Sequence, residues 1–284
     1  MRRIAAVSLA LTIGVSLGLF AQETPLFFVQ LSDTQFGMYA EDRGFEQETA
    51  NYEFAVATVN RLRPAFVVVT GDLVNKPGDE AQVAEYLRVS SKVTPLVPIY
   101  HVAGNHDVGN EATPESLAAY RRRFGPDYYS FRAGSLWGIV LNSVLIAAPQ
   151  KVRQDFERQE AWLKGELAKA RESGARHIVV FQHHPYFVTA PDEKDAYHNV
   201  PLERRRTYLD LLEAAGVRYV FAGHYHQNAV ARDGALEMIT TEPVGSPLGR
   251  GSSGIRIAAA SETGIQHRFF GFGDLPATLQ SAMK

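Results

Sequence analysis

The chain has 284 residues, an apolar share of 45% and a formal net charge of −2. That length suits one large domain or two small ones, and that apolar share suits a globular protein with a substantial core. The near-neutral charge argues against a basic surface for nucleic acid or anionic membranes. The chain has no cysteine, which excludes disulfides, thiolate metal ligands and a cysteine nucleophile.

The first 21 residues differ from the rest of the chain. Arg2 and Arg3 precede an uncharged run over residues 4–20, and Ala21 then supplies a small residue before a polar segment. This order is typical of a cleaved secretory signal peptide. The alternative is a retained anchor, because a run of this length is at the lower limit for crossing a bilayer. We favour a signal peptide over residues 1–21 and predict a periplasmic or secreted protein with no stable membrane span.

After this segment, short β-branched and aromatic runs alternate with helical patterns. The runs are nearly continuous in hydrophobicity, as expected for strands covered on both faces. Apolar residues recur at helical spacing over 49–61 and 154–171, and Glu203–Arg206 is expected to form the solvated first turn of a helix that reaches Leu212. The predicted strands are 26–31, 65–70, 96–102, 136–142, 177–182 and 217–222.

The chain after Gly234 is rich in strand and turn signals, and no repeat or linker divides it. We therefore predict a single α/β domain over residues 25–275.

Polar residues follow five of the predicted strands at the point where each strand ends. Parallel strands present their carboxyl ends along one edge of a sheet, where α/β proteins build their sites. Carboxylates, amides and imidazoles are ligands for borderline divalent metals. Each segment alone is a weak signal, but together they predict a metal site. The segments are Asp33, Gly71-Asp72, Gly104-Asn105-His106-Asp107, His183-His184 and Gly223-His224-Tyr225-His226.

This series of motifs, in this order, resembles the calcineurin-like metallophosphoesterase superfamily. The segments "SDTQFG", "RRFGPDYYSF" and "AGVRYVFAGHYHQN" are similar to the branch that contains the animal calcineurin-like phosphoesterase domain-containing protein phosphatases. The resemblance implies a four-layer αββα sandwich, in which two mixed β-sheets pack together and helices cover both outer faces.

The resemblance also implies a site with two divalent metal ions, which could be manganese, iron, magnesium or zinc, and a bridging hydroxide. Paired cations neutralise the phosphoryl charge and activate water near neutral pH. In this reading Asp72 bridges both ions and His106 donates a proton to the leaving group, while Asn75 and Asp107 support these residues. The expected ligands are Asp33, Gln35 and His226 for the first metal, and Asn105, His183 and His224 for the second.

The histidine pair at 183–184 and the glutamine at position 35 differ in how well they match the family's pattern. His183 is preferred over His184 because the family's ligand stands two residues before the proline, here Pro185, and neighbouring strand residues point in opposite directions. Gln35 stands where the superfamily usually has histidine. Because an amide oxygen is a weaker and harder donor than imidazole, we predict that the first metal binds more loosely than the second and favours manganese, iron or magnesium over zinc.

The leading functional hypothesis is therefore a metal-dependent phosphoester hydrolase that acts on a small phosphorylated substrate or a phosphoprotein. Phosphodiesterase activity at the same site is one alternative. A non-catalytic binding module is the other, although Asp72 and His106, which such a module would be expected to lose, are both present.

Overall fold

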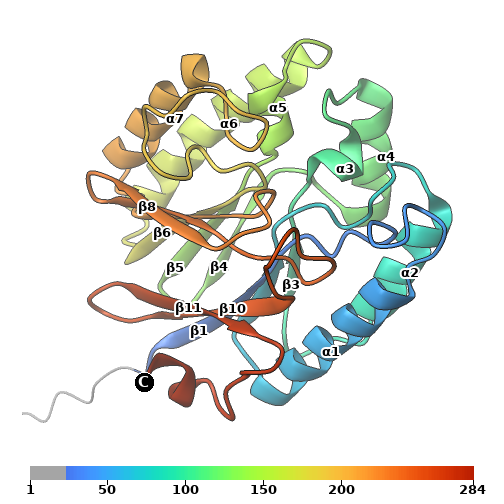
Figure 1. Ribbon diagram of the computed structural model, residues 1–284. Coiled ribbons are helices and arrows are strands. Elements are labelled where there is room, and N and C mark those ends of the chain that lie inside the picture. The colour runs from blue at the N-terminus through green and yellow to red at the C-terminus, as the bar shows by residue number, and fades with distance from the viewer. Residues whose placement is uncertain (1–23) are drawn as a thin grey trace, which may run out of the picture.

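The computed structural model describes residues 24–284 and contains two mixed β-sheets that pack face to face (Figure 1). The first sheet has the order β11-β10-β1-β2-β3, and the second has the order β4-β5-β6-β7-β9-β8. The strands of the first sheet are β1 (Leu26–Leu31), β2 (Phe66–Val69), β3 (Ile99–His101), β10 (Gly254–Ala260) and β11 (Ile265–Gly271). Those of the second are β4 (Tyr129–Ala133), β5 (Leu136–Val140), β6 (His177–Phe181), β7 (Tyr219–Ala222), β8 (Ala229–Asp233) and β9 (Leu236–Thr240).

Helices cover both outer faces, so the predicted four-layer αββα sandwich is confirmed. Helices α1 and α2 lie on the outer side of the first sheet, and α6 and α7 lie on the outer side of the second (Figure 1). The helices are α1 (Glu46–Leu62), α2 (Glu80–Ser90), α3 (Asn105–Val108), α4 (Pro114–Phe124), α5 (Ser143–Ala147), α6 (Arg153–Glu172), α7 (Leu202–Ala214) and the 3-10 helix η1 (Gln280–Met283). Among residues 24–284, no helix is both long and apolar enough to cross a bilayer.

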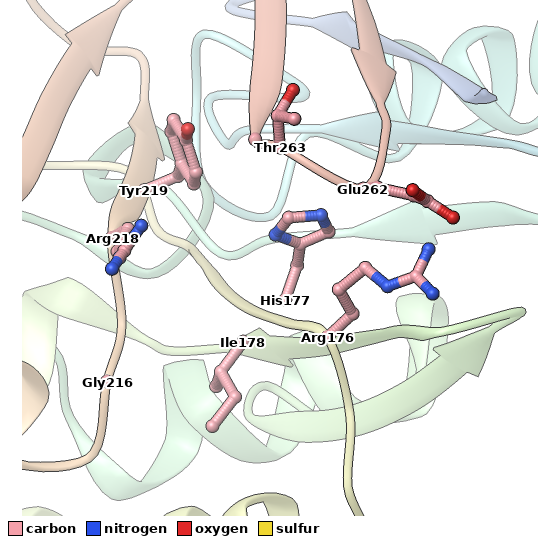
Figure 2. A pocket seen from close by; sticks show the side chains of 9 residues that line it. Arg176, His177, Ile178, Gly216, Arg218, Tyr219, Glu262 and Thr263 are labelled. Carbon is pink, nitrogen blue, oxygen red and sulfur yellow. The ribbon is translucent and has the colours of Figure 1, made fainter.

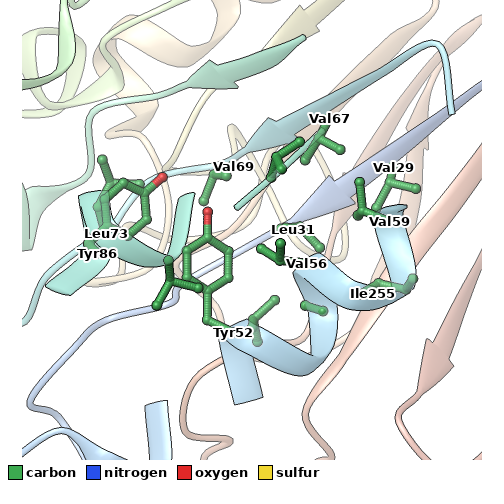
Figure 3. Close-up of a cluster of buried hydrophobic side chains, with 14 of the residues drawn as sticks. Val29, Leu31, Tyr52, Val56, Val59, Val67, Val69, Leu73, Tyr86 and Ile255 are labelled. Atoms are coloured by element: carbon green, nitrogen blue, oxygen red, sulfur yellow. The ribbon is translucent and has the colours of Figure 1, made fainter. Parts of the chain in front are cut away.

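The continuous hydrophobicity of the central strands follows from this layering. Alternate side chains of a strand point to opposite faces. In β2, Val67 and Val69 face α1 in an outer core, which Figure 3 shows packed around Tyr52 and Tyr86, while Phe66 and Val68 face the second sheet. Both faces are therefore buried, and no polar alternation is left in the strand.

Aromatic rings join the two sheets. Phe28 of β1 stacks on Phe66 at 4.9 Å between ring centroids and meets Phe221 of β7 edge-on at 5.4 Å. Such ring pairs add about 0.5–1.5 kcal/mol each beyond the area that they bury. This inter-sheet core sets the separation of the two sheets and hence the spacing of the loops that leave their ends.

The six predicted strands and the helices over 49–61, 154–171 and 203–212 are all present, with boundary shifts of up to three residues. Strands β4 and β8 and helices α2, α3, α4, α5 and η1 were not predicted. The prediction that Glu203–Arg206 is solvated is wrong for Arg205, which is fully buried. Its guanidinium donates to the carbonyls of Val200, Pro191 and Glu193, and these hydrogen bonds compensate for its burial. The predicted signal peptide lies outside the described residues.

Candidate functional site

The loops that follow β1 and β2 run side by side. The amide of Asp33 donates to the Gly71 carbonyl at 3.2 Å, and the amide of Gln35 donates to the Asp72 carbonyl at 2.8 Å. In the second sheet, the Gly223 amide donates to the His183 carbonyl at 3.0 Å. The two pairs of loops leave different sheets and converge at one end of the sandwich, where they bring the predicted ligands together.

One group of side chains gathers around Asp72. Its Oδ2 lies 3.1 Å from Nε2 of His183. The same nitrogen lies 3.0 Å from Oδ1 of Asn105 and 3.1 Å from Nδ1 of His224. Asp72, His183 and His224 each offer a ligand atom, and the three atoms lie within 4.8 Å of one another. The four side chains are buried, and their donor set suits a divalent cation.

A second group adjoins the first. Nε2 of His226 lies 3.3 Å from Oδ1 of Asp33, and both side chains are buried. Gln35 is also buried, and its Oε1 has no hydrogen-bond partner. A buried amide oxygen without a partner is costly, so its presence points to a ligand. Asp33, Gln35 and His226 therefore fit a second cation position.

The three histidines among the predicted ligands, His183, His224 and His226, are oriented in the same way. Each directs one ring nitrogen to a backbone carbonyl: His183 Nδ1 to Thr70 at 2.8 Å, His224 Nε2 to Tyr197 at 3.0 Å and His226 Nδ1 to Ser246 at 3.3 Å. An N–H that donates to a carbonyl leaves the other nitrogen unprotonated and ready to bind a metal. The nitrogens left over on His183 and His226 face Asp72 and Asp33, and the one on His224 faces Nε2 of His183.

The buried carboxylate and imidazoles of this cluster shift one another's pKa values. Burial disfavours the charged form of Asp72, but His183 and its neighbouring histidines hold the pKa of Asp72 well below its usual range. Burial opposes protonation of His183, yet Asp72 raises the His183 pKa to about 9. Burial and the adjacent His183 lower the pKa of His224 to about 4. Like these imidazoles, a bound cation would favour the ionised form of Asp72.

His106 lies at the edge of this cluster, at the start of α3. Its backbone N–H donates to Asp72 Oδ1 at 2.8 Å, and its Nδ1 lies 2.6 Å from the backbone carbonyl of Asn75. Asn75, which was expected to support Asp72 and His106, meets this ring through its backbone carbonyl, while its side chain contacts Gln35. Nδ1–H therefore donates to a carbonyl, and Nε2 is left to exchange a proton with a substrate.

Asp107 ties the loops together. Its Oδ1 accepts from the amides of Leu73 and Val74, and its Oδ2 accepts from the amide of Gly104 at 2.8 Å. The carboxylate thus joins the segment after Asp72 to the segment before Asn105. Asp107 thus supports Asp72 and Asn105 by holding the backbone beside them. Within residues 24–284, its side chain forms no hydrogen bond to a ligand side chain.

The backbone is strained at the predicted ligands. Among residues 24–284, eight non-glycine residues have positive φ, and five of them are predicted ligands: Asp33, Gln35, Asp72, His224 and His226. Such conformations cost about 1–3 kcal/mol each and cluster at functional sites. Gly104 shows how tightly the loops approach, because a Cβ there would lie 2.2 Å from Asp72 Oδ1.

His184 lies outside the ligand cluster. Its Nδ1 contacts the Ser143 hydroxyl at 2.9 Å, and its amide donates to the same oxygen at 2.8 Å. Burial, together with the nearby imidazoles of His224 and His183, lowers the His184 pKa well below its usual value. The geometry therefore places His183 among the ligand atoms and His184 against Ser143.

The loop between β6 and α7 contributes a residue that the sequence did not single out. Tyr197 is 67% exposed, yet its hydroxyl accepts from Asn105 Nδ2 at 3.1 Å and its ring lies 4.9 Å from that of His224. Arg205 holds this loop in place by donating hydrogen bonds to the backbone carbonyls of Pro191 and Glu193. No local pattern distinguishes Tyr197 from an ordinary loop tyrosine, because its neighbours are brought to it by the fold.

A cavity of about 320 Å³ lies elsewhere, at the other end of β6 (Figure 2). It is lined by Arg176, His177, Arg218 and Glu262 among others. His177 begins β6 and His183 follows its end, so the length of a strand separates the cavity from the cluster, about 3.3 Å per residue. The cavity is distinct from the candidate metal site.

Comparisons with known proteins agree with this geometry. The family model for calcineurin-like phosphoesterases matches residues 28–228. The serine/threonine-protein phosphatase CPPED1 of Danio rerio is 34% identical over 88% of this chain and 86% of its own, and that of Homo sapiens is 35% identical over 88% and 85%. A solved dimetal phosphatase from Danio rerio has the same fold, with a TM-score of 0.65 at 19% identity over 87% of this chain and 97% of its own. The chain therefore belongs to the calcineurin-like phosphoesterase family and is a metal-dependent phosphoester hydrolase.

Proposed function

We propose that this hydrolase is an exported phosphomonoesterase that binds two divalent cations. The observation that carries the proposal is the division of the ligand atoms into two adjoining groups. Asp33 and His226 form one pair at 3.3 Å, and Asp72, Asn105, His183 and His224 form a second group with contacts of 3.0–3.1 Å. Asp72 is the carboxylate assigned to both cations.

The first cation would be held by Asp33, Gln35, His226 and Asp72. Three oxygen donors and one imidazole favour manganese, iron or magnesium over zinc. The second would be held by Asp72, Asn105, His183 and His224, with two imidazoles. We expect the first cation to bind more loosely than the second.

When bound, the cations would neutralise negative charge on the phosphoryl oxygens and activate water. The residues of the chain supply the rest. Asn105 is oriented by Asn110 and Tyr197, which take both of its amide hydrogens at 2.8 and 3.1 Å and leave Oδ1 facing His183. His106, whose backbone N–H contacts Asp72 and whose Nδ1 faces the Asn75 carbonyl, keeps Nε2 free and donates a proton to the departing alcohol oxygen.

The substrate class is inferred from two observations. Relatives about 35% identical to this chain carry the name serine/threonine-protein phosphatase, which supports monoester cleavage. The N-terminal signal pattern supports export from the cytoplasm, and export would favour small phosphomonoesters, such as nucleotides or lipid-derived phosphates, over a signalling phosphoprotein.

A pair of chromogenic esters tests the reaction type. With manganese added, we expect 4-nitrophenyl phosphate to be hydrolysed at least about tenfold faster than bis(4-nitrophenyl) phosphate, because serine/threonine-protein phosphatases, whose name the relatives carry, act on phosphomonoesters. The Asp72→Asn variant serves as the background control. Faster cleavage of the diester would replace the monoesterase proposal with a phosphodiesterase.

Export is tested by the N-terminus of the mature protein. We expect protein recovered from the extracytoplasmic fraction to begin at Gln22, directly after Ala21. Mass spectrometry of the intact chain measures this directly. An intact Met1 in a membrane-bound fraction would instead establish a retained anchor.

A further inference from the structure

We infer that Asn75 and Asp42 position the amide of Gln35 so that its oxygen, and not its nitrogen, faces the first cation. This inference rests on the proposed function, because it takes Gln35 as a ligand. It concerns residues outside the ligand set, which act on the metal through Gln35.

The two ends of the Gln35 amide have different surroundings. Its Nε2 donates to Asn75 Oδ1 at 3.2 Å, while its Oε1 is buried without a partner. An amide has a donor end and an acceptor end, and rotation by half a turn would exchange them. An amide turned in that way would present hydrogens to a cation. Unlike the imidazole usual at this position, glutamine thus needs a partner that selects one of the two orientations.

Asn75 itself also has a fixed orientation. Its Oδ1 can accept from Gln35 only if its Nδ2 points away, and Nδ2 donates to Asp42 Oδ1 at 2.8 Å. A carboxylate only accepts hydrogen bonds, so the end of the Asn75 amide that contacts Asp42 must be the donor, Nδ2. The order of donors and acceptors is therefore set from Asp42 through Asn75 to Gln35.

Gln82 holds the outer end of this chain of hydrogen bonds in place. Its Nε2 donates to Asp42 Oδ1 at 2.8 Å, and its Oε1 accepts from the amides of Asn75 and Lys76 at 3.1 and 2.9 Å. Gln82 is 2% exposed and lies in the first turn of α2. One side chain thus fixes both the Asp42 carboxylate and the backbone of Asn75.

The backbone of Asn75 has a separate contact. Its carbonyl faces His106 Nδ1 at 2.6 Å. Replacing the Asn75 side chain leaves this carbonyl in the chain. Side-chain variants should therefore change the first cation site while the contact to His106 persists, which separates the two roles of this residue.

The test measures cation binding to the full mature chain. Metal-free protein is titrated with Mn²⁺ by calorimetry, and bound metal is counted by elemental analysis. For Asn75→Ala we expect the weaker of the two sites to lose about 10–100-fold in affinity, as is usual when the partner of a metal ligand is removed, and the tighter site to keep its affinity. Asn60→Ala is the matched control, since it also removes two side-chain hydrogen bonds from a half-buried asparagine, but near the end of α1.

A charge exchange provides the rescue. Asn75→Asp alone should also weaken the first site, because the new carboxylate faces Asp42 with no hydrogen between them. Adding Asp42→Asn restores a donor at that contact, while the new carboxylate still accepts from Gln35. We expect the double variant to recover affinity to within about threefold of wild type. A merely structural defect would not be repaired by exchanging the two groups.

The outcomes separate this inference from the proposal beneath it. If wild type binds only one Mn²⁺ per chain, the two-cation proposal fails and the inference fails with it. If wild type binds two and Asn75→Ala retains both affinities, or weakens both sites equally, only the role of Asn75 is overturned. If circular dichroism shows that Asn75→Ala does not fold, Asp42→Ala provides the same comparison, because Asp42 is the exposed end of the chain of hydrogen bonds. We expect a smaller loss of affinity at the weaker site for that variant.

Discussion

Replacing Asp72 by asparagine is expected to lower kcat/KM for a phosphomonoester by more than about 1000-fold and to reduce the metal content of the protein. The substitution keeps the shape of the side chain and removes the one carboxylate assigned to both cations. Asp72 is 1% exposed, so solvent does not replace the lost charge. Activity assays and elemental analysis of the same preparation measure both effects.

Asp127→Asn is the matched control for this change. Asp127 is 2% exposed and accepts from Arg121 Nε at 2.6 Å and Asn142 Nδ2 at 2.9 Å, away from the ligands. Its replacement removes a buried carboxylate and should lower stability while leaving metal content unchanged. Equal metal loss in both variants would show that folding, rather than ligation, explains the result for Asp72.

Replacing His106 by glutamine is expected to lower kcat by about 100- to 10,000-fold for an alkyl phosphate, because the departing alkoxide then receives no proton. Metal content should remain that of wild type, since the ring contacts a backbone carbonyl and lies outside the cluster of Asp72, His183 and His224. For 4-nitrophenyl phosphate, whose leaving group departs readily as an anion, the loss should be much smaller.

The comparison of the two esters distinguishes proton donation from phosphate binding. A loss of equal size for both esters would indicate that His106 holds the phosphoryl group instead of protonating the leaving oxygen. A loss of bound metal would place His106 among the ligands and contradict the geometry described above. A rise in KM with unchanged kcat would assign it to substrate binding alone.

Much of the fold was accessible from local patterns. Strand β2 was recognisable because Phe66–Val69 is apolar on both faces, and α6 was recognisable because Leu163 and Leu167 recur at helical spacing. Strand β4 was missed because it lies at a sheet edge and is only partly buried, so its residues lack a continuous apolar run. Helix α4 was missed because three consecutive arginines, at 121–123, obscure its apolar face.

The sequence by itself determined which chemical groups follow each strand, since the Asp, Asn and His residues of the motifs stand next to apolar runs and glycines. Only the tertiary structure decided how these groups meet. Asp33 and Asp72 leave one sheet, whereas His183 and His224 leave the other, and the inter-sheet aromatic core sets the separation at which their side chains come into contact. The same holds for the pairing of Gln35 with Asn75 and of Asn105 with Tyr197. Hydrogen bonds between residues far apart in the chain depend on distances that no local pattern encodes.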